Sequence, residues 1–260
     1  MAGKIQIKTS SVMSALMIFL LGVGLIDVSA KAEQPNPATR YHDCLALARK
    51  SPSKGFDAAI MWRDLGGDVA AEHCAAVSLF GLKQYQESAK RLEALAQVRT
   101  LSPPLKTDIL AQSAQGWFLS GDLSRADAVL SAALSISPDD PMLLTDRAQI
   151  RATQNDLIGA ISDLDRALSF DPNLVDALVF RAAAQRLNGN DTAATLDANE
   201  ALQIDSKHPE ALLERGILRR QAGDTAGARQ DWLQLIELYP NTVAAGMAQT
   251  NLGNMDVNKD

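Results

Sequence analysis

The amino-acid sequence predicts an all-α protein built as an array of paired helices. Alanines recur every 34 residues in the second half of the chain, and each is followed seven residues later by another apolar residue. The alanines are Ala126, Ala160, Ala194 and Ala228, and the later residues are Ala133, Ala167, Ala201 and Leu235. Pro138, Pro172 and Pro240 follow the same period, with Ser206 in the remaining place. A fixed period of this length indicates repeated small units rather than a single core.

The first 32 residues have the features of a secretory signal peptide. Two lysines precede an apolar run at 12–26, which is shorter than the roughly 20 residues that span a bilayer. Small residues then allow cleavage after Ala32, and those at 28–30 offer a second cleavage site. We therefore expect a mature chain that is periplasmic or secreted. An uncleaved membrane anchor is the alternative.

The charge of the chain argues against a nucleic-acid partner. The full chain has a formal net charge of −6, and residues 1–32 contain three Lys and one Asp, so the mature chain is more acidic still. Nucleic-acid binding needs clustered Lys and Arg side chains to contact phosphates, and no such cluster is present in the sequence.

The segment that follows the signal peptide is less regular than the rest. Residues 33–39 are polar with two prolines, and we expect them to be disordered. Residues 40–100 read as degenerate N-terminal helical repeats, because apolar residues recur there at helical spacing between Pro and Gly boundaries. The helices are expected at 42–50, 56–65, 69–82 and 85–95.

The chain has two cysteines, Cys44 and Cys74. In an oxidising compartment an even number favours a disulfide, and both residues lie at similar places on the first helices of consecutive pairs. A metal site with His42 and His73 is the alternative, although it would need a further ligand. We expect the disulfide and no metal.

The regular part, 107–240, contains four units of two helices each. In the clearest unit, apolar residues at helical spacing stop at Asn155-Asp156 and then resume. Asn155 suits a left-handed residue after a helix end, and Asp156 suits the cap of the next helix. Equivalent turns are Gly121-Asp122, Gly189-Asn190 and Gly223-Asp224. Residues 241–260 are expected to form a capping helix, at about 243–252, and a flexible tail.

This pattern resembles the tetratricopeptide repeat (TPR) family. The resemblance is carried by Leu144, Ala148, Ala160, Leu164, Ala167 and Pro172 and by their equivalents in the other three units. It implies a right-handed solenoid of antiparallel helix pairs, about six hairpins plus a C-terminal capping helix. It also implies that the first helices line a concave face that binds a segment of another protein. The Trp and Tyr residues frequent on the first helix of this family are largely replaced by Leu, Arg and Gln.

Three arginines recur with the same period and invite a functional reading. Each is followed sixteen residues later by an aspartate: Arg147 and Asp163, Arg181 and Asp197, Arg215 and Asp231. A row of guanidinium groups could bind an acidic peptide or a terminal carboxylate. However, one upstream unit has Ser113 and Val129 in place of both partners, so the charges are lost together. This coupling favours structural ion pairs within each unit.

The first helices also provide candidate binding residues. The Lys and Asn residues with which some TPR domains hold a C-terminal carboxylate are absent from the corresponding positions. These positions hold Ala111, Gln115, Thr145, Asp146, Gln149, Val179, Phe180, Ala183, Leu213 and Ile217. Toward the C-terminal end they suggest an apolar groove, formed by Phe180, Leu213 and Ile217 beside Arg186 and Arg220, that suits an extended or helical segment. The alternative is that these apolar residues simply pack between repeats.

Catalysis finds little support in the sequence. The three histidines, His42, His73 and His208, do not fall at metal-ligand spacing, and no Gly-x-Ser-x-Gly or phosphate-binding glycine loop is present. We therefore expect a non-enzymatic scaffold without a cofactor that binds a segment of another envelope protein. Two alternatives are a self-associating module, pairing near Trp232 and Tyr239 as a possible homodimer, and an accessory to a cell-envelope hydrolase.

Overall fold

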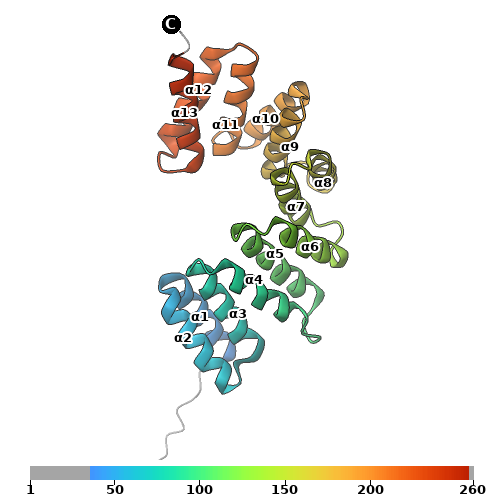
Figure 1. The fold of residues 1–260 in the computed structure, drawn as a ribbon, viewed down its shortest axis with the longest axis vertical. Coiled ribbons are helices and arrows are strands. Elements are labelled where there is room, and N and C mark those ends of the chain that lie inside the picture. Colours follow the sequence, from blue (N-terminus) through green and yellow to red (C-terminus); the bar gives the residue numbers. More distant parts are fainter. Residues whose placement is uncertain (1–35, 258–260) are drawn as a thin grey trace, which may run out of the picture. The chain divides into compact units, whose positions relative to one another are not determined.

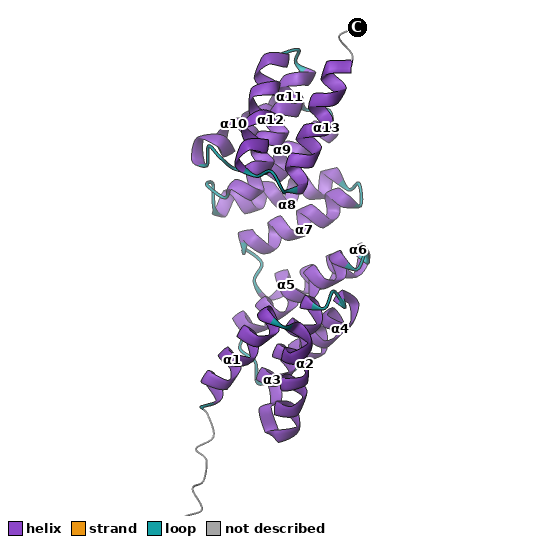
Figure 2. Cartoon of the chain, turned by 90° about the vertical axis from the view of Figure 1, so that its left-hand side faces the viewer, coloured by secondary structure: helices purple, strands orange, loops and turns teal. Residues whose placement is uncertain are grey.

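The computed structural model describes residues 36–257, which form thirteen α-helices and no strand within that range (Figures 1 and 2). The predicted signal peptide, 1–32, lies outside the described residues. The helices are α1 (Pro37–Lys50), α2 (Pro52–Trp62), α3 (Asp68–Gly81), α4 (Tyr85–Ala96), α5 (Pro103–Leu119), α6 (Leu123–Ile136), α7 (Pro141–Thr153), α8 (Leu157–Phe170), α9 (Val175–Leu187), α10 (Asp191–Ile204), α11 (Pro209–Gln221), α12 (Thr225–Leu238) and α13 (Val243–Val257). A kinked turn, η1 (Arg63–Gly67), in which Gly66 has φ 88°, joins α2 to α3.

The helices pack as six consecutive pairs plus α13, so the predicted all-α array is confirmed. Within each pair the first helix packs against the second, and the second packs against the first helix of the next pair. Helix α13 packs on α12 and α11 and ends the described array. None of the described helices is both long enough and apolar enough to span a membrane.

Several helix boundaries differ from the sequence prediction. Helix α1 begins at Pro37, inside the segment 33–39 that was expected to be disordered, because the Asn36 side chain accepts a hydrogen bond from the Ala38 N–H and Pro37 occupies the first turn. Helix α2 begins at Pro52 rather than near 56, again with proline in its first turn. Helix α13 continues to Val257, five residues beyond the predicted end.

The turns inside the four regular pairs repeat the same chemistry, as predicted. Asn155 has φ 66°, and the glycines in the three equivalent turns have φ between 83° and 86°. This left-handed conformation carries little strain for Gly or Asn. The next residue then caps the second helix: Asp156, for example, accepts a hydrogen bond from the Gly159 N–H at 2.9 Å. Each turn therefore ends one helix and starts the next within a few residues.

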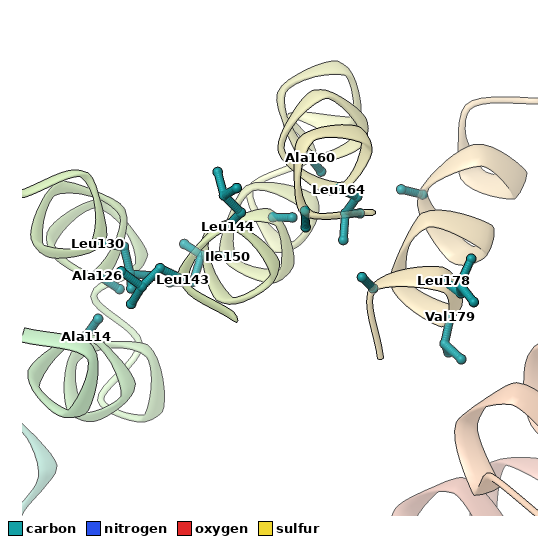
Figure 3. Close-up of a cluster of buried hydrophobic side chains, with 14 of the residues drawn as sticks. Ala114, Ala126, Leu130, Leu143, Leu144, Ile150, Ala160, Leu164, Leu178 and Val179 are labelled. Carbon is teal, nitrogen blue, oxygen red and sulfur yellow. The ribbon is translucent and has the colours of Figure 1, made fainter. Parts of the chain in front are cut away.

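The periodic alanines form the contact between the two helices of each pair. Ala126, Ala160, Ala194 and Ala228 are fully buried, as are Ala133, Ala167, Ala201 and Leu235. Larger apolar residues connect one pair to the next. Figure 3 shows Leu143 of α7 directed toward Leu130 and Ala126 of α6. Small residues therefore set the spacing within a pair, and leucines fill the space between pairs.

The three arginine–aspartate pairs lie between the two helices of their own unit. Each arginine donates two hydrogen bonds to its aspartate, from Nε and Nη2, at 2.7–2.9 Å. The carboxylates of Asp163, Asp197 and Asp231 are buried, with residue exposures of 3%, 5% and 1%. Hydrogen bonding to Asp163 raises the pKa of Arg147, and hydrogen bonding to Asp197 raises that of Arg181. Such bidentate pairs are geometrically specific.

A third side chain, four residues after each arginine, completes each buried pair. Arg151 and Arg219 each donate a further hydrogen bond, at 2.9 and 2.8 Å, to Asp163 and Asp231 respectively. In the pair between them, Gln185 donates to Asp197 at 3.2 Å. The buried carboxylates are thus satisfied within their own units.

A disulfide holds the N-terminal pairs together. Cys44 of α1 and Cys74 of α3 are bonded, with their Cα atoms 6.1 Å apart, and both are buried. Around them Ala48, Ala59 and Trp62 form a small core separate from the main one. The bond therefore links the first helices of the first two pairs, inside this separate apolar cluster.

The disulfide makes the N-terminal end of the array sensitive to reduction. Closing a loop between residues 30 apart should stabilise this end by about 3 to 4 kcal/mol through loss of unfolded-state entropy. We expect Cys44→Ser with Cys74→Ser to increase amide hydrogen exchange in α1–α3 while leaving α7–α10 unchanged. Intact-mass measurement of the oxidised protein, with and without reductant, checks the bond itself. Two free thiols would contradict the prediction.

The buried pairs should behave as coupled units in thermodynamic tests. Arg181→Ala and Asp197→Ala should each lower the free energy of unfolding, because each removes the bidentate contact. The loss should stay below the about 3 to 5 kcal/mol of an unpaired buried charge, since Asp197 keeps its bond from Gln185 and Arg181 its pair with Asp165. The double variant should lose clearly less than the sum. The exposed pair Arg166 and Asp139, 3.6 Å apart, serves as a control with an expected coupling below about 1 kcal/mol. Additive losses for the buried pair would show that the contact does not couple the helices.

Candidate functional site

Three hollows follow one another along the first helices α3, α5, α7 and α9. These four helices are labelled in Figure 1. The first lies between α3 and α5 and has a volume of about 110 Å³. The second, about 360 Å³, lies between α5 and α7, and the third, about 290 Å³, lies between α7 and α9. Gln112 and Gln115 line the first two hollows, and Gln149 lines the second and third. We call this row of hollows the first-helix groove.

The walls of the groove are mostly apolar, with amide groups between them. In the second hollow, Phe118 and Leu119 of α5 face Ile150 of α7. In the third, Phe180 and Leu187 of α9 lie opposite Ala152 of α7. The glutamines offer both donors and acceptors of hydrogen bonds. Such a surface can hold apolar side chains while hydrogen-bonding to an extended backbone.

The repeat sequence explains where the groove opens. One position on each first helix changes from small to large along the array: Ala111, Thr145, Val179, Leu213. Ala111 leaves space beside α7 and lines the second hollow. Leu213 is only 8% exposed and belongs to the apolar core. Of the four, only Ala111 lines a hollow, whereas Thr145, Val179 and Leu213 are buried, with exposures of 2%, 4% and 8%.

The residues predicted to line an apolar groove are divided by the structure. Phe180 is half-buried and lines the third hollow. Leu213 is buried in the core, so its assignment as an exposed anchor is wrong. Ile217 is half-buried and packs against the same core. The groove therefore opens nearer the middle of the array than the sequence suggested.

The two arginines predicted beside that groove also differ from each other. Arg186 forms an ion pair with Glu214 through Nε and Oε1, and its Nη2 lies 3.3 Å from Oε2. Its charge is therefore neutralised within the protein, and its assignment as a ligand-binding arginine is corrected. Arg220 is half-buried and takes part in none of the ion pairs between described residues. Through its ion pair with Glu214, Arg186 links α9 to α11.

The arginine ladder does not line the groove. Arg147, Arg181 and Arg215 are each bound twice to a buried aspartate, as described above. Their side chains are only 13–21% exposed. The geometry is that of structural ion pairs rather than of a free cationic surface.

The histidines are separated and serve local contacts. Tyr41 Oη lies 2.7 Å from His73 Nδ1, and Gln112 Oε1 lies 3.0 Å from His73 Nε2. Burial lowers the pKa of His73, and the contact with Gln112 opposes this shift. His208 contacts Asp176, whereas His42 is exposed. In the described range no three His, Cys, Asp or Glu side chains come together as a metal site.

Asp146 is the residue of the groove that the sequence did not single out as a binding group. It lies on the second turn of α7 and lines the second hollow. Its side chain reaches solvent, but the protein around it reduces hydration, and the carboxylates of Asp140 and Asp176 repel its charge. These effects raise its pKa to about 6. The size change from Ala111 to Leu213 was the available signal that this part of the groove is open.

Comparisons with known proteins give a likeness of fold. No family model matches the chain, and no curated protein matches it. Among solved structures, MamA (residues 41 to the end) from Desulfovibrio magneticus RS-1 has a TM-score of 0.55 and 15% identity, over 71% of this chain and 97% of that one. A crystal structure of MamA has a TM-score of 0.53 and 12% identity, over 62% of this chain and 92% of that one.

A shorter match is to the second TPR domain of human RPAP3 in complex with an HSP70 peptide. It has a TM-score of 0.44 and 19% identity over 45% of this chain, which is too weak to bear on function. The assignment of the fold rests on the 34-residue period, the six helix pairs and the turn chemistry, with the MamA structures as neighbours. The chain is therefore an all-α repeat protein with the tetratricopeptide-repeat fold.

Proposed function

We propose that this chain is a non-enzymatic, exported scaffold that binds a segment of another envelope protein in the first-helix groove. The observation that carries the proposal is the row of three hollows along α3, α5, α7 and α9, which share lining residues. The larger hollows are at the lower end of the range for ligand sites, about 300 to 1,000 Å³. Hollows of this size suit single side chains of a peptide better than one large ligand.

The shape of the groove favours an extended segment. Successive hollows lie between successive first helices, so an occupant must cross several helices to fill them. Gln115 and Gln149 stand where such a backbone would pass, and their amides can pair with its N–H and C=O groups. Because each glutamine sits beside an apolar wall, one segment could use both kinds of contact.

Export is supported by the sequence and is compatible with the disulfide. Residues 1–32 have the charge, apolar length and small residues of a signal peptide. A buried disulfide between Cys44 and Cys74 suits an oxidising compartment, where such bonds persist. N-terminal sequencing of the protein recovered from its native host tests this part of the proposal, since a chain that retains residues 1–32 would contradict it.

Self-association through the C-terminal end would have to use residues other than Trp232. Trp232 was expected near an open end of the array, but it is fully buried, and its Nε1 donates a hydrogen bond to the Leu213 carbonyl at 3.2 Å. Tyr239 packs partly against the core. Helix α13 lies on α11 and α12, so these aromatic residues stabilise the last pair.

Phe180 should contribute to partner binding more than to folding. Phe180→Ala should weaken binding by about 2 kcal/mol or more, as truncation of an aromatic anchor does. Because Phe180 is only half-buried, the loss of folding stability should be smaller than the about 3 to 5 kcal/mol of a fully buried Phe. Thermal melts beside quantitative pull-downs from envelope extract, with the chain starting at Glu33, separate the two effects.

Phe170→Ala is the matched control for this test. Phe170 is 50% exposed at the end of α8 and does not line the hollows, so its removal should leave captured proteins unchanged. If Phe180→Ala captures the same proteins as strongly as the unsubstituted chain, the first-helix groove is not the binding site.

A further inference from the structure

The first-helix groove carries one kind of charge. Among the residues that line the three hollows, Asp146 is the only ionisable side chain, and all others are apolar, amide or hydroxyl-bearing. No Lys or Arg stands in these walls. An occupant therefore meets apolar surface, amide groups and a single carboxylate.

The neighbouring carboxylates serve the fold, whereas Asp146 does not. Asp140 caps α7 by accepting hydrogen bonds from the Met142 and Leu143 N–H groups. Asp176, at the start of α9, lies 3.1 Å from His208 Nε2. Asp146 takes part in none of the hydrogen bonds or ion pairs between described residues. It is thus an unneutralised charge in a groove wall.

The equivalent position in another unit shows which kind of partner Asp146 lacks. Glu214 occupies the equivalent position two units later, and its partner is Arg186, 28 residues earlier in the chain. The residue 28 positions before Asp146 is Phe118, which lines the same hollow. Arg186 thus pairs with Glu214, whereas the residue equivalent to Arg186 near Asp146 is Phe118, and the space between is open.

We propose that the groove binds an extended peptide segment whose Lys or Arg side chain pairs with Asp146, while apolar side chains of the segment enter the hollows lined by Phe118 and Phe180. This inference rests on the proposed function and specifies the chemistry of the partner. The ligand's cation would take the place that Arg186 has opposite Glu214. A segment with an acidic residue or a terminal carboxylate at this point would meet Asp146, with the charges of Asp140 and Asp176 nearby, and be repelled.

A selection among random peptides tests the charge of the partner directly. Short peptides displayed on phage would be selected on the immobilised chain starting at Glu33, and in parallel on Asp146→Asn, at low ionic strength and about pH 7.5. We expect Lys or Arg to be enriched at one position among apolar residues, and the enrichment to disappear for Asp146→Asn. Glu200→Gln, an equal change of charge on the exposed face of α10, should leave the enrichment intact.

One selected peptide then tests the pairing. Replacing its cationic residue with Met should weaken binding by about tenfold, as should Asp146→Asn, and the two changes together should weaken it little further. Peptides that depend on Phe180 but are acidic, or show no preference for charge, would overturn this inference and leave the proposed function standing. If no selected peptide depends on Phe180, the proposed function fails as well.

The same substitution should stabilise the fold at neutral pH. Because the pKa of Asp146 is raised to about 6, the folded state holds its proton more tightly than the unfolded chain, where the pKa is about 3.9. The ionised carboxylate therefore lowers stability above about pH 6 and has no such effect below the unfolded pKa. Melting curves of Asp146→Asn should show a higher Tm than the unsubstituted chain at about pH 7.5, with the difference vanishing near pH 4.

A higher melting temperature also separates lost binding from lost folding. If Asp146→Asn melts lower than the unsubstituted chain at neutral pH, Asp146 has a structural partner, and its assignment to ligand binding is wrong.

Discussion

The close crossing of the two helices within each pair is the constraint on which the rest of the array depends. The crossing positions hold alanine or glycine, and a larger side chain there would push the axes apart. The last unit shows that the close contact is kept although the residue types change. A Cβ atom added to Gly216 would lie 2.2 Å from Trp232 Nε1, whereas the equivalent contact in the preceding unit joins Ala182 and Ala198. Glycine has no Cβ atom, so Gly216 leaves the space that the indole ring of Trp232 occupies.

The buried ion pairs add orientation to this spacing. Apolar surfaces of two helices can slide past one another at little cost, but a bidentate contact between Arg147 and Asp163 holds only one arrangement. The unit formed by α5 and α6 lacks both charges, and its residues at these positions make different contacts. Ser113 donates to the Ala89 carbonyl of α4 at 2.9 Å, and Val129 needs no partner. Because both charges are absent together, no unpaired ion is left inside that unit.

The periodic features could be predicted from the sequence, and the aperiodic ones could not. Helix pairs, turns, crossing alanines and the spacing of Arg181 and Asp197 all repeat, so four copies of one pattern supported each inference. The start of α1 was missed because the polar, proline-containing composition of residues 33–39 predicted disorder. The local signal for the correct start was Asn36-Pro37, which is typical of a helix N-terminus. The exposure of Leu213 was misjudged because this position faces the interior in the two preceding units as well, where Thr145 and Val179 are 2% and 4% exposed.

At the positions that depart from the period, the four regular units differ in their local contacts. Every unit has a residue at the position of Asp146, and the four differ in what they do. Gln112 contacts His73 and Glu214 pairs with Arg186, so both tie a first helix to the preceding one. Gln112 also lines the first two hollows, and Asp146 and Phe180 line the second and the third. Because the helix pairs pack in the same order whichever residue stands there, this position changes the local surface of the first helices more than the fold.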